Sequence, residues 1–174
     1  MHALRIGRVL GIDIGVDAPN PQQLLHSDHA CLEALFEELL EEFADGHQRE
    51  LRSTWTEFER RILVHFDAEE RFILPLFERV NLEETAAVRA EHAQIRQLLG
   101  DLGVGVDLHL VRLELARELI DFLRAHAQRE ELLLYRWAAR ELDATARAAV
   151  AQELHHSLPE QGEVRALPGP SDHG

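Results

Sequence analysis

Four long stretches of the chain carry apolar residues at the spacing of a helix with one buried face. In residues 20–45, leucines and phenylalanines recur at helical spacing. Residues at i, i+3, i+4 and i+7 fall on one side of an α-helix, and that side must be covered for the helix to be stable. Similar patterns cover about residues 47–80, 81–102 and 107–142. Four such helices with short connections predict an all-α fold, an antiparallel up-down-up-down four-helix bundle.

Capping and turn residues indicate where these helices begin and end. Asn20 is a good N-cap and Pro21 suits the first helical position, while Asp-Gly at residues 45–46 is expected to end the first helix. Asn81, with Glu84 three residues later, matches a capping box in outline. The first and third helices therefore have defined expected starts.

Breakers and turn residues divide the rest of the chain. Pro75 lies inside the second pattern and should kink that helix or end it early. The glycines of GDLGVGVD, residues 100–107, predict the turn before the last long helix. Asp143 is expected to begin a short extra helix that reaches about Leu154.

The length of 174 residues suits one domain with a hydrophobic core. We expect an N-terminal arm at residues 1–19, the bundle at residues 20–142, and a short C-terminal helix with a loose tail at residues 143–174. No stretch approaches the roughly 18 apolar residues of a membrane helix. The first 19 residues also lack the apolar core of a signal peptide. A cytoplasmic location is therefore expected.

The charge of the chain argues against two classes of partner. Asp and Glu number 32 against 18 Lys and Arg, which gives a formal net charge of -14. Such a surface repels phosphate backbones and anionic lipid, so neither nucleic acid nor a membrane is an expected partner. Cys31 is the only cysteine, which excludes an intrachain disulfide and a cysteine-rich metal motif.

A degenerate internal repeat contains the histidines and acids that could form a functional site. The tripeptides DHA (28–30) and EHA (91–93) lie in the first and third helices, and HFDAEE (65–70) and HAQREE (126–131) in the second and fourth. Their histidines are offset by similar amounts, 92 − 29 = 63 and 126 − 65 = 61 residues. Each half of the bundle thus offers one acid-His-Ala motif and one His-x-x-x-Glu-Glu motif.

Helix geometry brings these motifs together. A histidine and a glutamate at i and i+4 are side by side on one helix face. Measured from the helix ends that share one end of the bundle, the four motifs lie 9 to 13 residues deep. At about 1.5 Å per residue, these depths agree within roughly 6 Å. All four helices should therefore present His or His and Glu to the same layer.

Four imidazoles and two carboxylates suit a pair of borderline-hard metal ions. Two octahedral ions would still have open positions, where dioxygen, peroxide or nitric oxide could bind. A ferritin-like site is disfavoured, because it uses Glu-x-x-His at i and i+3 and more carboxylates. A purely structural network of His–Glu hydrogen bonds is the other interpretation.

These residues resemble the hemerythrin-like (HHE cation-binding) domains over about residues 22–140. The resemblance rests on one histidine in the first and third helices and a His-x-x-x-Glu pair in the second and fourth. It implies a non-haem centre of two iron ions, which an oxo or hydroxo group can bridge. The implied ligands are His29, His65, Glu69, His92, His126 and Glu130. Glu69 and Glu130 would be the bridging carboxylates.

The chain departs from the oxygen-carrying hemerythrins of that family at two places. Those proteins have a second histidine four residues after the one in the third helix, where this chain has Arg96. They use His-x-x-x-x-Asp in the last helix, where this chain has Glu131, with Glu130 one residue earlier. The resemblance is therefore closer to the wider group, whose members are linked to iron, oxygen, peroxide and nitric oxide.

The expected function is a di-iron protein that reacts with or senses oxygen, peroxide or nitric oxide, or handles iron. An enzyme that consumes peroxide or oxygen is one alternative, and an interaction module with a structural metal is another. A small diatomic ligand or peroxide is the expected partner, whereas no protein partner can be named.

Several nearby residues have open roles at this point. His26 could be an extra ligand, lie beside an access path, or be an exposed residue. Asp28 and Glu91 could orient neighbouring histidines. Glu70 and Glu131 are expected to face solvent or form salt bridges, with Glu131 as an alternative to Glu130. Tyr135 is interpreted as a packing residue, and Cys31 as a small buried one.

Overall fold

The computed structural model describes residues 20–45 and 48–156, which contain helices and turns but no strand. The helices are α1 (Pro21–Asp45), α2 (Gln48–Phe72), α3 (Leu74–Phe77), α4 (Leu82–Asp107), α5 (Leu113–Leu132), α6 (Leu134–Glu141) and α7 (Ala144–His156). The expected all-α fold is confirmed. The expected N-terminal arm at 1–19 and the tail after residue 156 lie outside the described residues.

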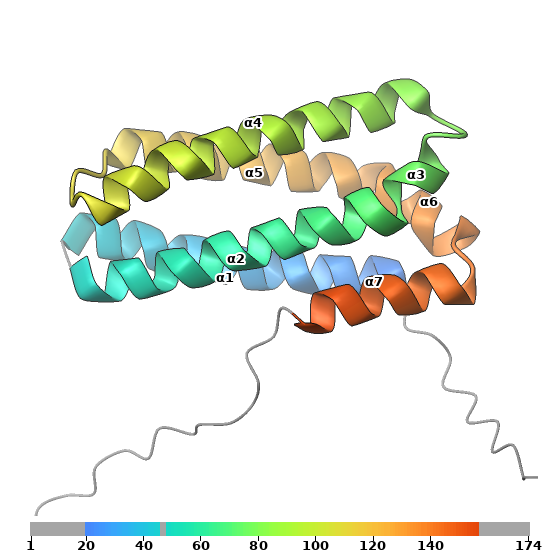
Figure 1. The fold of residues 1–174 in the computed structure, drawn as a ribbon, viewed down its shortest axis with the longest axis horizontal. Helices are drawn as coiled ribbons and strands as arrows, with labels where there is room; N and C mark the ends of the chain where they lie inside the picture. The colour runs from blue at the N-terminus through green and yellow to red at the C-terminus, as the bar shows by residue number, and fades with distance from the viewer. Residues whose placement is uncertain (1–19, 46–47, 157–174) are drawn as a thin grey trace, which may run out of the picture.

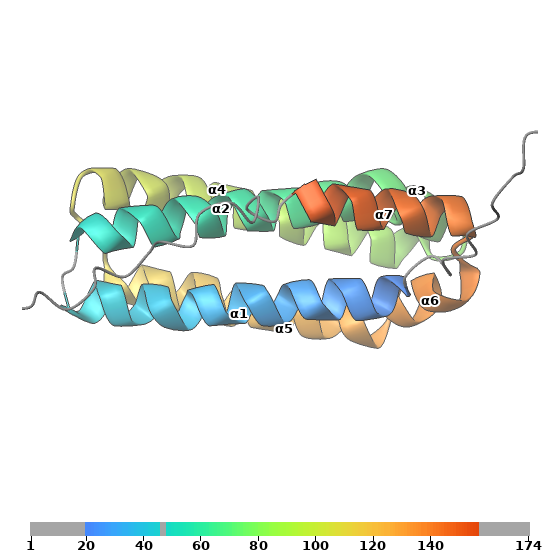
Figure 2. The same cartoon turned by 90° about the horizontal axis from the view of Figure 1, so that it is seen from below.

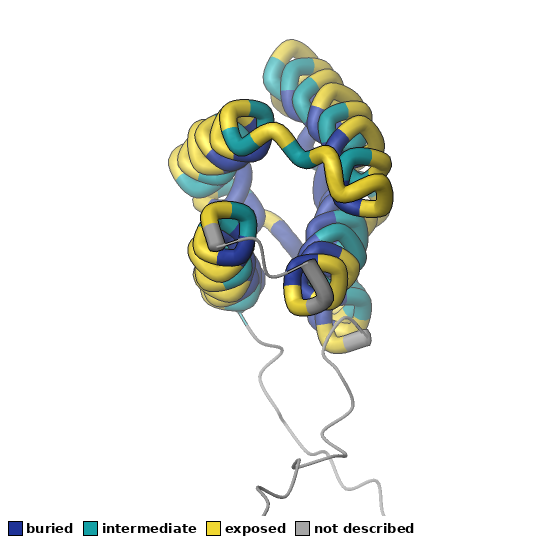
Figure 3. Tube along the Cα trace, turned by 90° about the vertical axis from the view of Figure 1, so that its left-hand side faces the viewer, coloured by how far each residue is buried: buried dark blue, intermediate teal, exposed yellow. Residues whose placement is uncertain are grey.

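The four long helices α1, α2, α4 and α5 form an antiparallel bundle (Figure 1). Consecutive long helices run in opposite directions. Around the bundle, α1 packs against α2 and α5, and α4 packs against the same two helices. The end view in Figure 3 shows buried residues facing inward and exposed residues outward. This is the up-down-up-down arrangement that the sequence predicts.

A layer of polar side chains crosses the bundle between two apolar clusters. The larger cluster fills the half of the bundle nearest the α1–α2 and α4–α5 connections and includes Phe36, Trp55 and Leu102. The second cluster lies at the other end and brings in residues of α3, α6 and α7. On α1, for example, His29 stands between Leu25 of the second cluster and Leu32 of the larger one.

Two of the long helical segments are interrupted at matching places. The α2–α3 break lies at Ile73 (φ −109°, ψ −57°), two residues before Pro75, whose missing N–H cannot continue the helix. The α5–α6 break lies at Leu133 (φ −119°, ψ −66°), where the sequence has no proline. The expected early end at Pro75 is thus observed, whereas the expected unbroken helix from 107 to 142 is wrong.

The glycines at residues 100–107 do not form the expected turn. Instead α4 continues to Asp107, and α5 begins only at Leu113. Leu102 and Val106 are almost fully buried in the larger cluster. Their burial contributes about 1.5–3 kcal/mol each, which offsets the cost of about 1 kcal/mol for each helical glycine.

The extra helix and the N-cap at Asn81 are present, but the full capping box is not, because the Glu84 carboxylate accepts from Arg129 and the Asn81 N–H bonds Phe77 O. Asn81 accepts a hydrogen bond from the backbone N–H of Glu84 (3.1 Å) at the start of α4. Asp143 does the same for the N–H of Ala146 (2.8 Å) at the start of α7. Figures 1 and 2 show α7 lying along α2 and α1 on the outside of the bundle. None of the described helices is long and apolar enough to cross a membrane.

Candidate metal centre

All six residues that the resemblance implies as ligands lie together in the polar layer. They come from four different helices and form two overlapping groups. The first donor group consists of Glu69, His92, His126 and Glu130, all buried. The second donor group consists of His29, His65 and Glu130. Within each group the donor atoms lie within 4.8 Å of one another, a spacing at which they could hold a metal ion.

Each histidine of the cluster contacts a carboxylate through its Nδ1 atom. Three of these contacts are short: His65 to Asp28 (2.8 Å), His92 to Glu70 (2.8 Å) and His126 to Glu91 (2.7 Å). The fourth, between His29 and Glu131, is longer at 3.3 Å. An ionised carboxylate can only accept, so Nδ1 carries a proton, and Nε2 is the atom that presents a lone pair when the imidazole is neutral.

The acids of the repeat orient imidazoles on other helices. Asp28 and Glu91, for which the sequence left this role open, each contact a histidine of the adjacent helix. Glu70 and Glu131, expected at the solvent side or in salt bridges, are partly exposed, and each forms a salt bridge with a histidine. Every acid of the DHA, EHA and Glu-Glu motifs outside the donor groups thus fixes one imidazole.

The four Nε2 atoms point into the cluster. Those of His29 and His65 are 3.2 Å apart. That of His126 lies 2.9 Å from Glu130 Oε1, and that of His92 lies 3.4 Å from the same oxygen. A lone pair on nitrogen facing a carboxylate oxygen is repulsive unless a positive charge, either a proton or a metal ion, lies between them.

The two glutamates each face both donor groups. Glu130 presents Oε1 to the first group and Oε2 to His29 of the second, at 3.5 Å. Glu69 presents Oε2 to His92 at 3.3 Å and Oε1 to His65 at 3.6 Å. Both carboxylates therefore have the arrangement that a bridging ligand needs.

In the metal-free cluster, protons on histidines balance the negative charge of the carboxylates. Burial lowers the pKa of His65, but the charges of Glu69 and Asp28 outweigh it and raise the pKa to about 9. Burial likewise opposes the protonated form of His92, and hydrogen bonds to Glu130 and Glu69 raise its pKa to about 10. Burial raises the pKa of Glu130, but His126 and the other histidines hold it well below its usual value. A cation entering the cluster would replace these protons.

Several donor atoms of the cluster fit a metal ion better than a protein partner. Both oxygens of Glu69 and Nε2 of His126 are buried without a well-directed hydrogen bond from any described residue. His126 Nε2 and Glu130 Oε1 are close, at 2.9 Å, but their relative direction does not make a hydrogen bond. Buried polar atoms are normally satisfied, so atoms left without a partner around one point indicate a ligand. Nitrogen and carboxylate oxygen are suitable donors for iron or zinc.

Tyr135 packs in the second apolar cluster, as expected, but its hydroxyl also belongs to the metal-ligand cluster, which the sequence did not indicate. It is fully buried, and its hydroxyl lies 3.0 Å from Nε2 of both His29 and His65. It also donates a hydrogen bond to Glu130 Oε2 (3.2 Å). Burial and the neighbouring Glu130 charge raise the pKa of this hydroxyl well above 10, so it is protonated in the metal-free protein.

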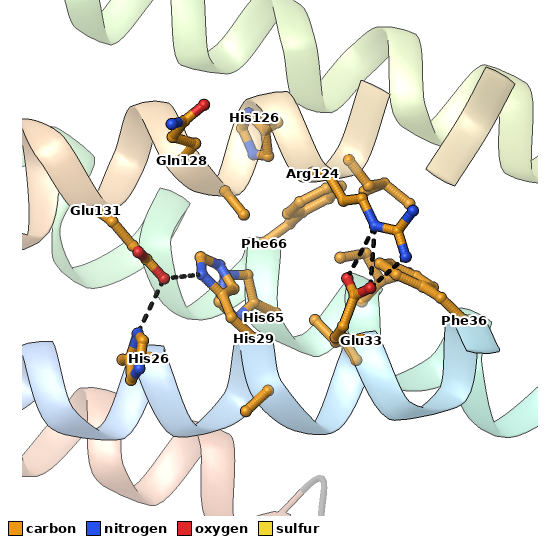
Figure 4. Close-up of a pocket in the computed structure, with 15 residues that line it drawn as sticks. His26, His29, Glu33, Phe36, His65, Phe66, Arg124, His126, Gln128 and Glu131 are labelled. Carbon is orange, nitrogen blue, oxygen red and sulfur yellow. Dashed lines mark hydrogen bonds and ion pairs between the residues drawn. The ribbon is translucent and has the colours of Figure 1, made fainter. Parts of the chain in front are cut away.

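A cavity of about 290 Å³ opens onto the cluster between α1 and α5 (Figure 4). The histidines His29, His65 and His126 form part of its lining. Its remaining walls are largely apolar, and they include Leu32, Phe36, Ile62, Phe66 and Leu123. A water molecule occupies roughly 30 Å³, so a diatomic molecule or peroxide has ample room.

Charged side chains border this cavity. His26 is exposed and contacts Glu131 at 3.0 Å, so it lies beside the cavity and outside both donor groups. Arg124 bonds Glu33 on α1 and so links α5 to α1 at another edge of the cavity (Figure 4). It also bonds Glu37, one turn further along α1. Cys31 is exposed, contrary to expectation, and is outside both donor groups.

Arg96 occupies the position where the oxygen carriers have a histidine. Its guanidinium donates to Glu70 (2.7 Å) and lies 5.3 Å from the centre of the Phe66 ring. Phe66 in turn stacks on His92, with ring centres 3.9 Å apart. Arg96 therefore supplies no lone pair to the cluster, but it holds Glu70 and, through it, the His92 imidazole.

A helical bundle that gathers four imidazoles and two carboxylates in one layer, all of them buried except the partly exposed His29, is typical of a cation-binding class of protein. The sequence profile of the Hemerythrin HHE cation binding domain matches residues 20–138, and a second match covers residues 84–161. The chain belongs to this family. The second match begins near the start of α4, where the second half of the internal repeat lies. No curated protein and no solved structure gave a significant match.

Proposed function

We propose that the chain binds two iron ions in the two donor groups and that this centre reacts with dioxygen, peroxide or nitric oxide. The role that fits best is a sensor, a stress-response protein or an iron-handling protein. The main support for the proposal is the arrangement of the two glutamates. In each of them, one carboxylate oxygen faces the first donor group and the other oxygen faces the second. A single metal ion would need only one of these groups.

The side chains have separate tasks in this proposal. The imidazole Nε2 atoms and the two glutamates bind the ions, and the four carboxylates at Nδ1 keep each imidazole in the metal-binding tautomer. Iron supplies redox chemistry and open coordination positions when bound. The cavity between α1 and α5 admits a small ligand, and its apolar walls limit water at the centre.

Reversible oxygen carriage is disfavoured by Arg96. The carriers have a histidine at that position, and here a guanidinium occupies it and pairs with Glu70. A guanidinium remains protonated and has no lone pair for a metal. The group that holds His92 therefore has one nitrogen donor fewer than in a carrier, which leaves an additional position for a reacting ligand or solvent.

One experiment distinguishes this proposal from two other functions, an enzyme and a protein with a structural metal. The metal-free chain would be loaded with ferrous iron without oxygen, and absorbance would be followed after mixing with dioxygen, hydrogen peroxide or nitric oxide. We expect about two irons per chain and a stoichiometric spectral change with at least one reagent. Catalytic turnover of peroxide or dioxygen would favour the enzyme. Tight zinc binding with no iron uptake would favour a structural metal and would refute the redox proposal.

A further inference from the structure

The two donor groups are unequal, and Tyr135 lies where the smaller group lacks a donor. The first donor group has four side chains, whereas the second has three. The Tyr135 hydroxyl is within hydrogen-bond distance of a donor atom on each member of the second group: His29, His65 and Glu130. With it, each group would contain four donors and share Glu130.

The spacing of these atoms is that of ligands around one ion. The hydroxyl is 3.0 Å from both His29 Nε2 and His65 Nε2 and 3.2 Å from Glu130 Oε2. The two nitrogens are 3.2 Å apart, and His29 Nε2 is 3.5 Å from Glu130 Oε2. Neighbouring ligands at about 2.0–2.2 Å from a metal are about 2.8–3.1 Å from each other in octahedral geometry and about 3.3–3.6 Å in tetrahedral geometry.

Hydrogen bonding explains only part of this arrangement. The hydroxyl has one proton, which it donates to Glu130, whereas neutral imidazoles at His29 and His65 would present Nε2 lone pairs to its oxygen. One hydroxyl proton cannot serve three acceptors at once. In the metal-free protein, protonation of His65 relieves this conflict, and a shared cation would relieve it for all four side chains.

We propose that the Tyr135 oxygen is a metal ligand in the second donor group, together with His29 and His65. This inference rests on the metal binding proposed above and adds a donor that the family resemblance does not imply. On binding, the O–H bond breaks, the phenolate oxygen bonds to the ion, and the proton passes to solvent. A bound cation favours the deprotonated ligand, as it does for a thiol.

The internal repeat makes this ligand specific to one of the two ions. Shifted by the offset of the histidine pairs, 126 − 65 = 61, Tyr135 corresponds to Leu74 in the first half. Leu74 is fully buried in the second apolar cluster, as Tyr135 is, but it offers no donor atom. The two ions are therefore chemically distinct, and only the one in the second donor group has a phenolate.

Tyr135 is the only tyrosine of the chain, so any tyrosinate signal belongs to it. The full chain would be loaded anaerobically with ferrous iron, oxidised in air, and examined by absorption and resonance Raman spectroscopy. A visible phenolate-to-ferric charge-transfer band with phenolate ring vibrations is expected. A parallel zinc titration of the metal-free chain should give the ultraviolet difference spectrum of tyrosinate, without any redox change.

Two variants separate ligation from packing. Tyr135→Phe removes only the hydroxyl, and it should lose both signals while one of the two ions binds at least about tenfold more weakly. Trp137→Phe changes an aromatic side chain in the same short helix that packs on Phe77, and it should keep both signals. Thermal unfolding of the metal-free variants reports any loss of packing separately.

The outcomes distinguish this inference from the function on which it rests. Two bound irons or zincs per chain without a tyrosinate signal would overturn the ligand role of Tyr135 and leave the metal centre in place. Wild-type protein that binds neither metal would overturn both proposals. Equal affinity of the wild type and Tyr135→Phe for both ions would also refute ligation.

Discussion

Replacing Asp28 by asparagine should weaken metal binding although Asp28 belongs to neither donor group. Asp28 is 5% exposed, and its two oxygens have different partners. Oδ1 accepts from Nε (2.9 Å) and Nη2 (2.7 Å) of Arg61, and Oδ2 accepts from Nδ1 of His65 (2.8 Å). Both partners are donors, so an amide, with one oxygen and one NH₂ group, can satisfy only one of them.

The size of the effect follows from which partner loses its acceptor. If the NH₂ group faces His65, Nδ1 must accept and the proton moves to Nε2, the atom that should bind metal. If it faces Arg61, a buried guanidinium loses its carboxylate. Loss of such a supporting carboxylate typically lowers metal affinity about 10- to 100-fold, or about 1.4–2.7 kcal/mol.

Glu131→Gln is the matched control. Glu131 also accepts from an imidazole Nδ1, that of His29, but at 3.3 Å and with 39% of its side chain exposed. Water can replace an exposed acceptor, so the affinity should fall only a few-fold. Both variants would be assayed by competition with a chelator at constant pH. Unchanged affinity in Asp28→Asn, or an equal loss in both variants, would refute the tautomer argument.

Two further predictions concern stability of the metal-free chain. Gly100→Ala should stabilise the protein by about 0.4–1 kcal/mol in denaturant unfolding, because an added Cβ meets no atom within 4 Å. Gly103→Ala should gain less, because its Cβ would lie 3.3 Å from Trp55 Nε1, and an equal gain would contradict that contact. Stability should also fall as pH rises from about 6.5 to 10, since the pKa values of His65 and His92 are raised to about 9 and about 10 by neighbouring carboxylates despite burial. The unfolded chain loses these protons first, so the stabilisation is complete below the unfolded pKa and lost above the folded one. A melting temperature that is constant over this pH range would be inconsistent with protonated histidines in the cluster, and metal-loaded protein should lack the decline.

The helices were largely predictable because their apolar spacing and caps are local signals. Asn81 and Pro75 act as the sequence predicts, since one supplies a cap and the other lacks an N–H. The glycines at 100–107 misled the prediction because turn propensity competes with burial of residues far away in sequence. Their helical state depends on what Leu102 and Val106 contact in the folded bundle, and propensity alone does not include that contact.

The sequence could predict that the six side chains lie together. Residues at i and i+4 share one helix face, and the four motifs lie at similar distances from the same end of the bundle. The partners across helices were not predictable, because spacing along one helix does not specify which acid faces which imidazole. Tyr135 was missed for a further reason. On an unbroken helix it would point about 140° away from Glu130, five residues earlier. The break at Leu133 changes that direction, and no proline marks it in the sequence.

The central claim is that the polar layer holds two metal ions. It is tested most directly by the anomalous scattering of iron in a crystal of the iron-loaded protein. We expect two peaks inside the bundle, one among Glu69, His92 and His126 and one among His29 and His65, with Glu130 contacting both. A single peak, or iron bound only at surface histidines such as His26, would contradict the account.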